Sequence, residues 1–224
     1  MHYKNLYLIG TSHIAIQSIN EVKYSVENLK PRIIALELDL LRLQSLLSPK
    51  KQKLKLKDVK RFGIKGFLFN FIGAYIEKKL GKLVGIKPGT EMKTALELAG
   101  KHKIGVALID QDIAITLKNL SDRLTTKEKL RFISDIVKGF FFKKAISINL
   151  REVPSKSMIK KLTGQVKKRY PSLYKTLIED RDLYMAKVLY KIINQYPKDN
   201  ILAIVGAGHV DGIIKNIKRS KNEG

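Results

Sequence analysis

Four short apolar runs are spaced along the chain, and a glycine or an acidic residue follows each of them. They are Leu6–Ile9, Ile33–Leu36, Val106–Ile109 and Ile201–Val205. Continuous apolar character over so few residues is typical of strands that are covered on both faces. Helical patterns follow each run, so the sequence predicts an α/β fold with a largely parallel central sheet flanked by helices.

The spacing of apolar residues predicts helices between these strands. A helix that carries Ile16 and Ile19 should stop near Lys30, because Pro31 disfavours a helical conformation in the residue before it. Asp39 is suited to be the N-cap of a helix over Leu40–Leu47.

Two stretches, residues 50–85 and residues 122–196, are predicted as helical additions to the sheet. In the second, Pro154 and Ser155 open one helix, and Pro171 suits the first turn of the next. The apolar stripe of this last helix is predicted to be Leu173, Leu177, Tyr184, Val188 and Ile192. The sequence has no internal repeat or low-complexity linker, so residues 1–224 are predicted to form a single domain.

Two Gly-x-x-His turns are the strongest signal of chemistry in the sequence. His13 ends the first, after Gly10, and His209 ends the second, after Gly206. Each turn follows an apolar run, so both histidines should lie at the carboxyl ends of strands, where ligands bind in open α/β sheets. Either histidine alone could equally be a helix cap or a core residue. The like placement of the two favours a role as metal ligands or proton carriers.

Carboxylates follow the other two predicted strands. Glu37 and Asp39 come after the second run, and Asp110 and Asp112 follow the third. Two histidines and a carboxylate form a divalent-metal site that activates water, and the same groups without a metal form an acid–base system. Asp39 and Asp112 could instead be helix caps. Glu37 and Asp110 continue their strands more directly and are the stronger candidates.

Two other charged residues are candidates for the site. Arg181 falls inside the predicted apolar stripe, where a charge needs a partner. Glu179, Asp180 and Asp182 surround it in the sequence, so it is either part of a structural salt bridge or a clamp for an anion. Glu91 follows Gly89 at the start of a predicted helix, where the helix dipole stabilises an acid whatever else it does.

An ordered set of motifs over nearly the whole chain resembles the TraB/PrgY family. The motifs are Ile9-Gly10-Thr11-Ser12-His13, Ala35-Leu36-Glu37-Leu38-Asp39 with Arg42, Pro88-Gly89-Thr90-Glu91-Met92, Leu108-Ile109-Asp110-Gln111-Asp112-Ile113, Glu179-Asp180-Arg181-Asp182 with Met185-Ala186, and Val205-Gly206-Ala207-Gly208-His209-Val210 with Gly212. This family is grouped with Tiki-type proteases and with erythromycin-esterase and ChaN-like proteins.

The resemblance implies a hydrolase scaffold that uses a metal or a His/Glu pair. Its centre falls on His13, Glu37 and His209, which would hold a divalent metal ion or activate water. The supporting charged positions fall on Arg42, Glu91, Asp110, Arg181 and Asp182, with Arg181 joining the catalytic group.

The sequence departs from the family pattern in two places. Family members commonly carry Arg between the two acids of the third motif, where this chain has Gln111. Many members also continue into membrane-spanning helices after the second histidine motif, whereas this sequence ends at Gly224. No membrane-spanning segment is therefore expected in it.

Charge and composition narrow the classes of function. The net charge is +24, mostly from lysine, and only Lys50 to Arg61 concentrates it, with seven basic residues in twelve positions. Without interleaved aromatic residues this run favours a solvated surface over a specific nucleic-acid site, although contact with an anionic membrane surface stays open. The chain has no cysteine, which excludes thiolate chemistry, and a cytoplasmic location is the default expectation.

The leading hypothesis is a metal-dependent hydrolase, with a peptide or small molecule as substrate. The rival is a non-catalytic peptide-binding or signalling protein, and an electrostatic adaptor is third. Two apolar segments, Gly66–Ile76 and Gly139–Phe142, are expected to form either a homodimer contact or the wall of a substrate cleft, with internal helices as the alternative.

If the positive charge is a solvated surface, the protein should bind duplex DNA weakly and without sequence preference. The affinity should fall steeply with salt, because binding then depends on the release of counterions from phosphates. Fluorescence anisotropy with two unrelated duplexes over a salt series measures this. Tight binding that persists at several hundred millimolar salt would contradict it.

Overall fold

The structure is a computed structural model that describes residues 1–11, 16–48, 89–141 and 155–220. In chain order the described elements are β1 (His2–Tyr3), β2 (Leu6–Thr11), α1 (Ile16–Leu29), β3 (Ile33–Leu36), α2 (Leu40–Leu47), α4 (Thr90–His102), β4 (Gly105–Leu108), α5 (Ile113–Arg123), α6 (Thr126–Phe141), α7 (Lys156–Arg169), α8 (Pro171–Tyr174), the π-helix η1 (Lys175–Glu179), α9 (Asp180–Gln195), β5 (Ile201–Gly206) and α10 (Val210–Ser220). His13, the predicted addition over 50–85 with its segment 66–76, and residue 142 lie outside the described residues.

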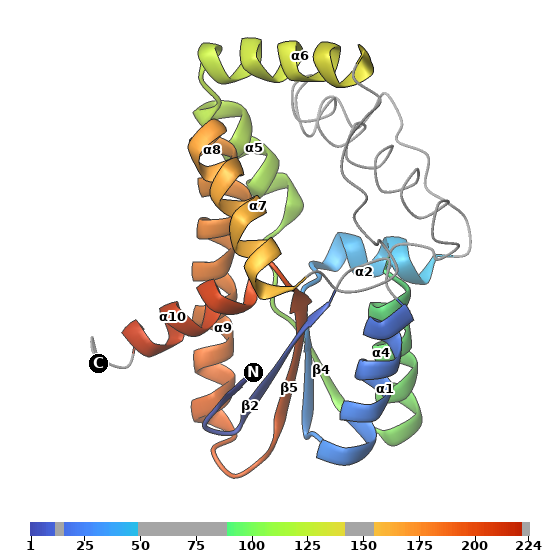
Figure 1. Ribbon diagram of the computed structural model, residues 1–224. Helices are drawn as coiled ribbons and strands as arrows, with labels where there is room; N and C mark the ends of the chain where they lie inside the picture. The colour runs from blue at the N-terminus through green and yellow to red at the C-terminus, as the bar shows by residue number, and fades with distance from the viewer. Residues whose placement is uncertain (12–15, 49–88, 142–154, 221–224) are drawn as a thin grey trace.

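The described strands form one five-stranded sheet in the order β1-β2-β5-β3-β4 (Figure 1). β5 pairs in parallel with both β2 and β3, and β3 pairs in parallel with β4. The four strands predicted from the apolar runs are therefore confirmed, as is their parallel arrangement. The short strand β1 adds an antiparallel edge beside β2. All four parallel strands end at the same edge of the sheet, which places the residues that follow them close together.

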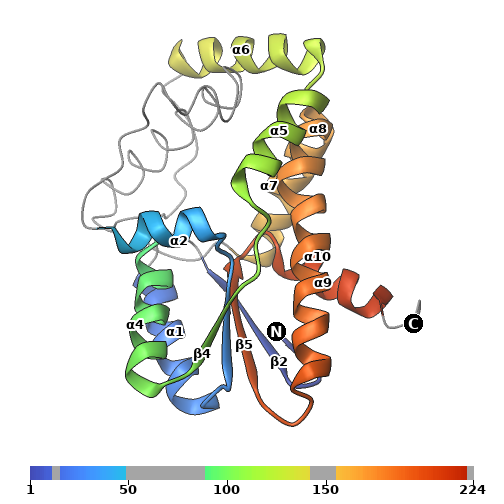
Figure 2. The ribbon, with the colours of Figure 1, turned by 180° about the vertical axis from the view of Figure 1, so that it is seen from behind.

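Helices cover both faces of the sheet and form a three-layer α/β fold (Figures 1 and 2). α1 and α4 pack on one face, and α9 and α10 pack on the other. The core on the first face includes Val22, Val26, Met92, Ala95, Ile34, Leu202 and Ile204. The core on the second face includes Leu8, Ala203, Val205, Met185, Leu189, Ile213 and Ile217.

The strands differ in how far they are covered. Every residue of the central strand β5 is buried, as its continuous apolar run predicts. The edge strand β4 differs, because Gly105 and Val106 are exposed and the Val106 side chain is 42% accessible. The expectation that all four runs are covered on both faces is wrong for β4, since its apolar run indicates a strand but not its place at the sheet edge.

The second predicted addition, residues 122–196, is helical where it is described, but it is not all additional to the sheet. α6, α7 and α8 lie beyond the carboxyl edge of the strands (Figure 1). α9, in contrast, belongs to the central layers, because Met185, Leu189 and Ile193 pack in the core on one face of the sheet. None of the helices described here is long and apolar enough to cross a membrane.

The predicted helix that starts at Pro171 is interrupted by a π-helix. α8 begins at Pro171, as predicted, but η1 spans Lys175–Glu179 before α9 begins. The wider turn moves the buried face of α9, so that Tyr184 is 42% exposed and Met185, one residue later, is fully buried. The predicted stripe through Tyr184 is therefore wrong, because it assumed 3.6 residues per turn throughout.

Local signals in the sequence fix the ends of two helices. α1 ends at Leu29, and Lys30 has a left-handed φ of 44° before Pro31, as the proline predicts. Asp39 is the N-cap of α2 and accepts a hydrogen bond from the Arg42 amide at 2.8 Å, which confirms the predicted cap. α2 therefore starts immediately after the acidic motif of β3.

A capping box starts α6 and ties it to α8. Thr125 Oγ1 accepts from the Glu128 amide at 3.2 Å, and Glu128 Oε2 accepts from the Thr125 amide at 3.1 Å. Glu128 Oε1 also accepts from the Ser172 amide at 2.8 Å, in the first turn of α8. One buried carboxylate thus serves the first turns of two helices.

Replacing Glu128 with Gln should lower the free energy of unfolding by about 1 kcal/mol at neutral pH, because it removes a charged cap. Burial raises the pKa of Glu128, but hydrogen bonds from Ser172 and Thr125 outweigh it and hold this pKa below its ordinary value of 4.5. A depressed carboxyl pKa gives stability that is present above the ordinary value and is lost as the pH falls through the folded-state pKa. Urea unfolding should therefore show the difference between the two proteins shrinking in acid.

Glu97→Gln is the matched control, because Glu97 lies on the exposed face of α4, where it pairs with Lys93 at 3.7 Å. It should change the free energy of unfolding by less than about 0.5 kcal/mol. An E128Q protein as stable as wild type at neutral pH would contradict the capping role.

Candidate functional site

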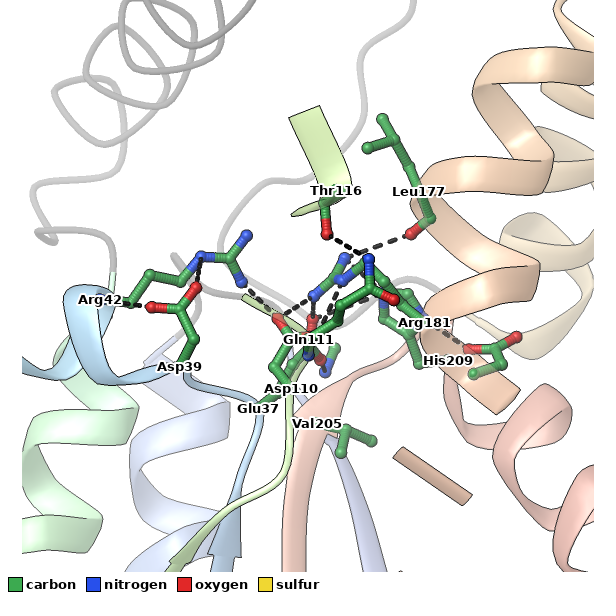
Figure 3. A network of polar contacts seen from close by, with 12 residues as sticks. Glu37, Asp39, Arg42, Asp110, Gln111, Thr116, Leu177, Arg181, Val205 and His209 are labelled. Atoms are coloured by element: carbon green, nitrogen blue, oxygen red, sulfur yellow. Dashed lines mark hydrogen bonds and ion pairs between the residues drawn. The ribbon is translucent and has the colours of Figure 1, made fainter. Parts of the chain in front are cut away.

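The residues that follow the parallel strands meet above the carboxyl edge of the sheet (Figure 3). Glu37 follows β3, Asp110 follows β4 and His209 follows β5, and Arg181 reaches them from the first turn of α9. All four are buried, with 9% or less of each residue accessible. The carboxyl edge therefore carries a buried polar cluster, which we call the arginine network.

Arg181 makes most of the contacts within the arginine network. Its Nε and Nη2 donate to Asp110 Oδ1 at 2.9 Å and to Asp110 Oδ2 at 2.7 Å, a two-pronged pairing. Nη2 also pairs with Glu37 Oε1. Nη1 donates to the Leu177 carbonyl at 3.2 Å and lies 3.2 Å from His209 Nε2. The guanidinium is therefore bonded to all three of the motifs that end β3, β4 and β5.

The protonation of Arg181 follows from these neighbours. Burial lowers the pKa of the Arg181 guanidinium, but the charges of Glu37 and Asp110 and their hydrogen bonds outweigh it and raise this pKa above its ordinary value. Arg181 therefore stays charged, and its cation balances two buried carboxylates. The prediction that Arg181 is buried with partners is correct, although Asp110 and Glu37, rather than its sequence neighbours, are those partners.

Glu37 also binds the turn that carries the second histidine. Its Oε2 accepts from the Gly206 amide at 2.5 Å, and its own amide donates to the Ile204 carbonyl at 3.1 Å. One oxygen of the carboxylate thus fixes the start of the Gly-x-x-His turn. The other faces Arg181 and lies 3.4 Å from His209 Nε2.

His209 is held between two acids. Its Nδ1 lies 2.6 Å from Asp182 Oδ1, and its Nε2 faces Arg181 and Glu37. A guanidinium cannot accept a hydrogen bond, so the contact with Arg181 requires Nε2 to accept and places the ring proton on Nδ1, where Asp182 receives it. Burial raises the pKa of Asp182, and its hydrogen bond and charge interaction with His209 oppose this rise.

Arg42 extends the arginine network to the surface. Its Nη1 donates to Asp110 Oδ2 at 2.5 Å, and its side chain is 34% accessible. Asp39 sets the position of this residue, because it caps α2 through the Arg42 amide and also accepts from the Ile113 amide of α5 at 3.0 Å. Asp110 therefore bridges one buried and one partly exposed arginine.

The other predicted positions serve local structure. Asp112 caps α5 by accepting from the Ala114 amide at 2.6 Å, so the capping alternative holds for it. Gln111, which stands where the family commonly has arginine, donates to Thr116 Oγ1 at 3.1 Å. Glu91 is buried in the first turn of α4.

Two of the three predicted metal ligands come together. Glu37 Oε1 and His209 Nε2 are 3.4 Å apart, but both atoms face the Arg181 guanidinium. Within the described ranges there is no group of three or more acidic or histidine side chains that could hold a metal ion, and His13 is not among the residues searched. The described residues therefore do not fit a metal ion while Arg181 keeps its place.

Comparison with known proteins identifies the family. The family model described as TraB/PrgY/gumN matches residues 2–224. The chain belongs to this family. An uncharacterized protein from Methanocaldococcus jannaschii is 38% identical over 223 residues, which is 97% of this chain and 54% of that protein. TraB domain-containing proteins from Homo sapiens and Mus musculus are 23% and 22% identical over 241 residues, which is 94% of this chain and 62% of each of theirs.

The TraB/PrgY/gumN match covers the whole arginine network, and the chain spans about half to three fifths of the length of these relatives. The arrangement described above is therefore that of one TraB-type region.

Sequence reasoning missed three contributions to the site. The Gly206 amide and the Leu177 carbonyl are backbone groups, and a pattern of side chains does not predict their contacts. Gly212 is the third, because a Cβ built on it would lie 2.6 Å from Asp182 Cγ. Glycine is thus what lets the Asp182 carboxylate approach the first turn of α10 and reach His209. The sequence did offer one signal for Gly212. Glycine destabilises the interior of a helix, so a glycine within a helical pattern can indicate that another group packs closely against the backbone there.

Gly212→Ala should destabilise the protein by about 1–3 kcal/mol, because the new methyl group collides with the Asp182 carboxylate. In an Asp182→Ala background the same change should be neutral or stabilise by up to about 1 kcal/mol, the ordinary helix preference for alanine. A double-mutant cycle measured by urea unfolding tests this.

Gly164→Ala in α7 provides the control, because a Cβ there meets nothing within 4 Å. It should show no coupling to Asp182. Additive effects of G212A and D182A would mean that Gly212 does not position this carboxylate.

Proposed function

We propose that this protein is a hydrolase that adds water to the carbonyl group of a peptide or another small acyl substrate. The observation that carries the proposal is the placement of His209 between two acids at the carboxyl edge of the sheet. Its Nδ1 lies 2.6 Å from Asp182, and its Nε2 lies 3.4 Å from Glu37. A histidine oriented by a carboxylate is the arrangement that general-base catalysis requires.

In this proposal a water molecule displaces the Arg181 N–H from His209 Nε2. The water oxygen then bonds to the substrate carbonyl carbon while Nε2 takes a proton of the water. The scissile C–N or C–O bond then breaks, and the same proton passes to the leaving nitrogen or oxygen. Asp182 keeps the imidazole in the tautomer with Nε2 free of a proton, and Glu37 orients the water beside it. The positive charge of Arg181, whose guanidinium stays bonded to Asp110 and Glu37, stabilises the negative charge that develops on the carbonyl oxygen.

Arg42 is the proposed substrate-binding residue. It is the part of the arginine network that reaches the surface, and Asp110 holds its guanidinium. A fixed guanidinium suits a carboxylate on the substrate. His13, from the first Gly-x-x-His turn, and the divalent metal ion stay predictions of the sequence, as do the homodimer and the cytoplasmic location.

A second candidate function is the binding of a peptide without catalysis. The arginine network favours this candidate, because the hydrogen-bond donors of Arg181 already have partners within the protein and the neighbouring side chains are buried. A saturated buried network is also what a purely structural ion-pair cluster looks like. In this case Arg42 would hold the ligand and nothing would be cleaved.

His209→Ala and Glu37→Gln should each lower kcat/KM by about 100-fold or more, since each removes a group that handles the proton of the water. The assay follows cleavage in a mixed peptide and ester library by mass spectrometry and then measures rates on any substrate found. Asp182→Asn should lower kcat more than it raises KM, because it acts through the histidine.

His102→Ala and Glu97→Gln are the matched controls, because both residues lie on α4 outside the arginine network and are exposed. Their rates should equal the wild-type rate. Cleavage that survives both H209A and E37Q would refute the proposed roles of His209 and Glu37, and a library in which nothing is cleaved would refute the hydrolase. Saturable peptide binding that needs Arg42 but gives no cleavage would support the second candidate.

A further inference from the structure

The Arg181 guanidinium has five N–H groups, and the protein uses all of them. Nε donates to Asp110 Oδ1, and the two N–H groups of Nη2 serve Asp110 Oδ2 and Glu37 Oε1. Those of Nη1 serve the Leu177 carbonyl and His209 Nε2. A buried cation with every donor satisfied is a fixed part of the site rather than a side chain that waits for a ligand.

The lone pairs that Arg181 occupies are those that a divalent ion would use. Glu37 Oε1 and His209 Nε2 lie 3.4 Å apart. Two ligand atoms of one tetrahedral metal ion, each at a bond length of about 2.1 Å, lie roughly 3.4 Å apart as well. The spacing of the two ligand atoms therefore suits a metal ion. The Arg181 guanidinium occupies both of them and so excludes the ion.

The carboxylates of the cluster also need a cation. Glu37 and Asp110 are buried, Arg181 pairs with both of them, and Arg42 also pairs with Asp110. Without Arg181 the cluster would lose the cation that contacts both carboxylates, and buried negative charge with less compensation is costly. Any small cation that reached it would then be strongly attracted.

We infer that Arg181 is an internal cation that takes the place of a divalent metal ion, so that the guanidinium and a metal ion compete for Glu37 and His209, with the charge of Asp110 beside them. Removing the guanidinium while keeping these three residues converts the cluster into a metal site. The inference concerns the site of the proposed hydrolase but does not depend on hydrolysis, because its readout is metal affinity.

The test compares Arg181→Met with the wild-type protein, both without an affinity tag and freed of metal. Methionine keeps an unbranched apolar side chain in place of the aliphatic part of Arg181 and removes the positive charge. Isothermal titration with Zn²⁺ should show one site per chain in R181M, with an affinity about tenfold or more above that of wild type, because the ion no longer faces a positive charge at contact distance. Zinc should also raise the Tm of R181M and not that of wild type.

Three further variants locate the site. Adding Glu37→Gln or His209→Ala to R181M should abolish the gain in zinc affinity. Arg123→Met is the matched control, because Arg123 pairs with Asp180 on a more exposed part of the same helical region. It should leave zinc affinity at the wild-type level.

Folding gives a second readout. If R181M is unfolded without metal, recovery of its folded circular dichroism signal on adding zinc supports the inference, because the ion then replaces the guanidinium. Equal zinc affinities of R181M and wild type overturn it. So does an R181M chain that stays unfolded with zinc present, since the ion then fails to take the place of Arg181.

Discussion

One buried positive charge determines how the carboxyl edge of this sheet is built. An unpaired charge in the interior is costly, and breaking a buried pair typically costs about 3–5 kcal/mol. Arg181 therefore has to be met by Asp110 and Glu37, which lie within two residues of the ends of β4 and β3. The pairing joins segments up to 144 residues apart in the sequence. Charge compensation and apolar packing therefore act together where α9 meets the ends of the strands.

Backbone groups and glycine complete what the charges begin. The Gly206 amide gives Glu37 a second partner, which links the ion pair to the turn that carries His209. Gly212 leaves room for Asp182, which orients the other side of the imidazole. The histidine is thus placed by residues at the ends of β3 and β5 and in α9 and α10. A chemical role for His209 depends on this placement as well as on its identity.

The sequence predicted the parallel sheet and much of the site, and the reasons for its failures are physical. The runs that became β2, β3, β4 and β5 were recognisable because buried parallel strands are continuously apolar. The exposure of Val106 depends on strand order, which a run of residues does not encode.

The same contrast holds at the site. Strand ends marked Glu37, Asp110 and His209 as neighbours, because parallel strands share an edge. The partners of Arg181 were missed because they are distant in sequence, and the stripe of α9 was misplaced because no local signal announced the π-helix. Whether a metal ion belongs to the cluster depends on competition with a guanidinium, which a list of ligand types does not reveal.

The π-helix makes the angular position of the arginine depend on a count of residues. η1 has one residue more per turn than the α-helical path it interrupts, and Arg181 and Asp182 follow directly after it. Removing that residue would turn the start of α9 by about 100° about its axis. The guanidinium would then point away from Glu37 and Asp110, although every residue of the arginine network would still be present in the sequence. Within this family, a one-residue gap between Lys175 and Glu179 would therefore mark a chain whose cluster is organised differently, even where its motifs read the same.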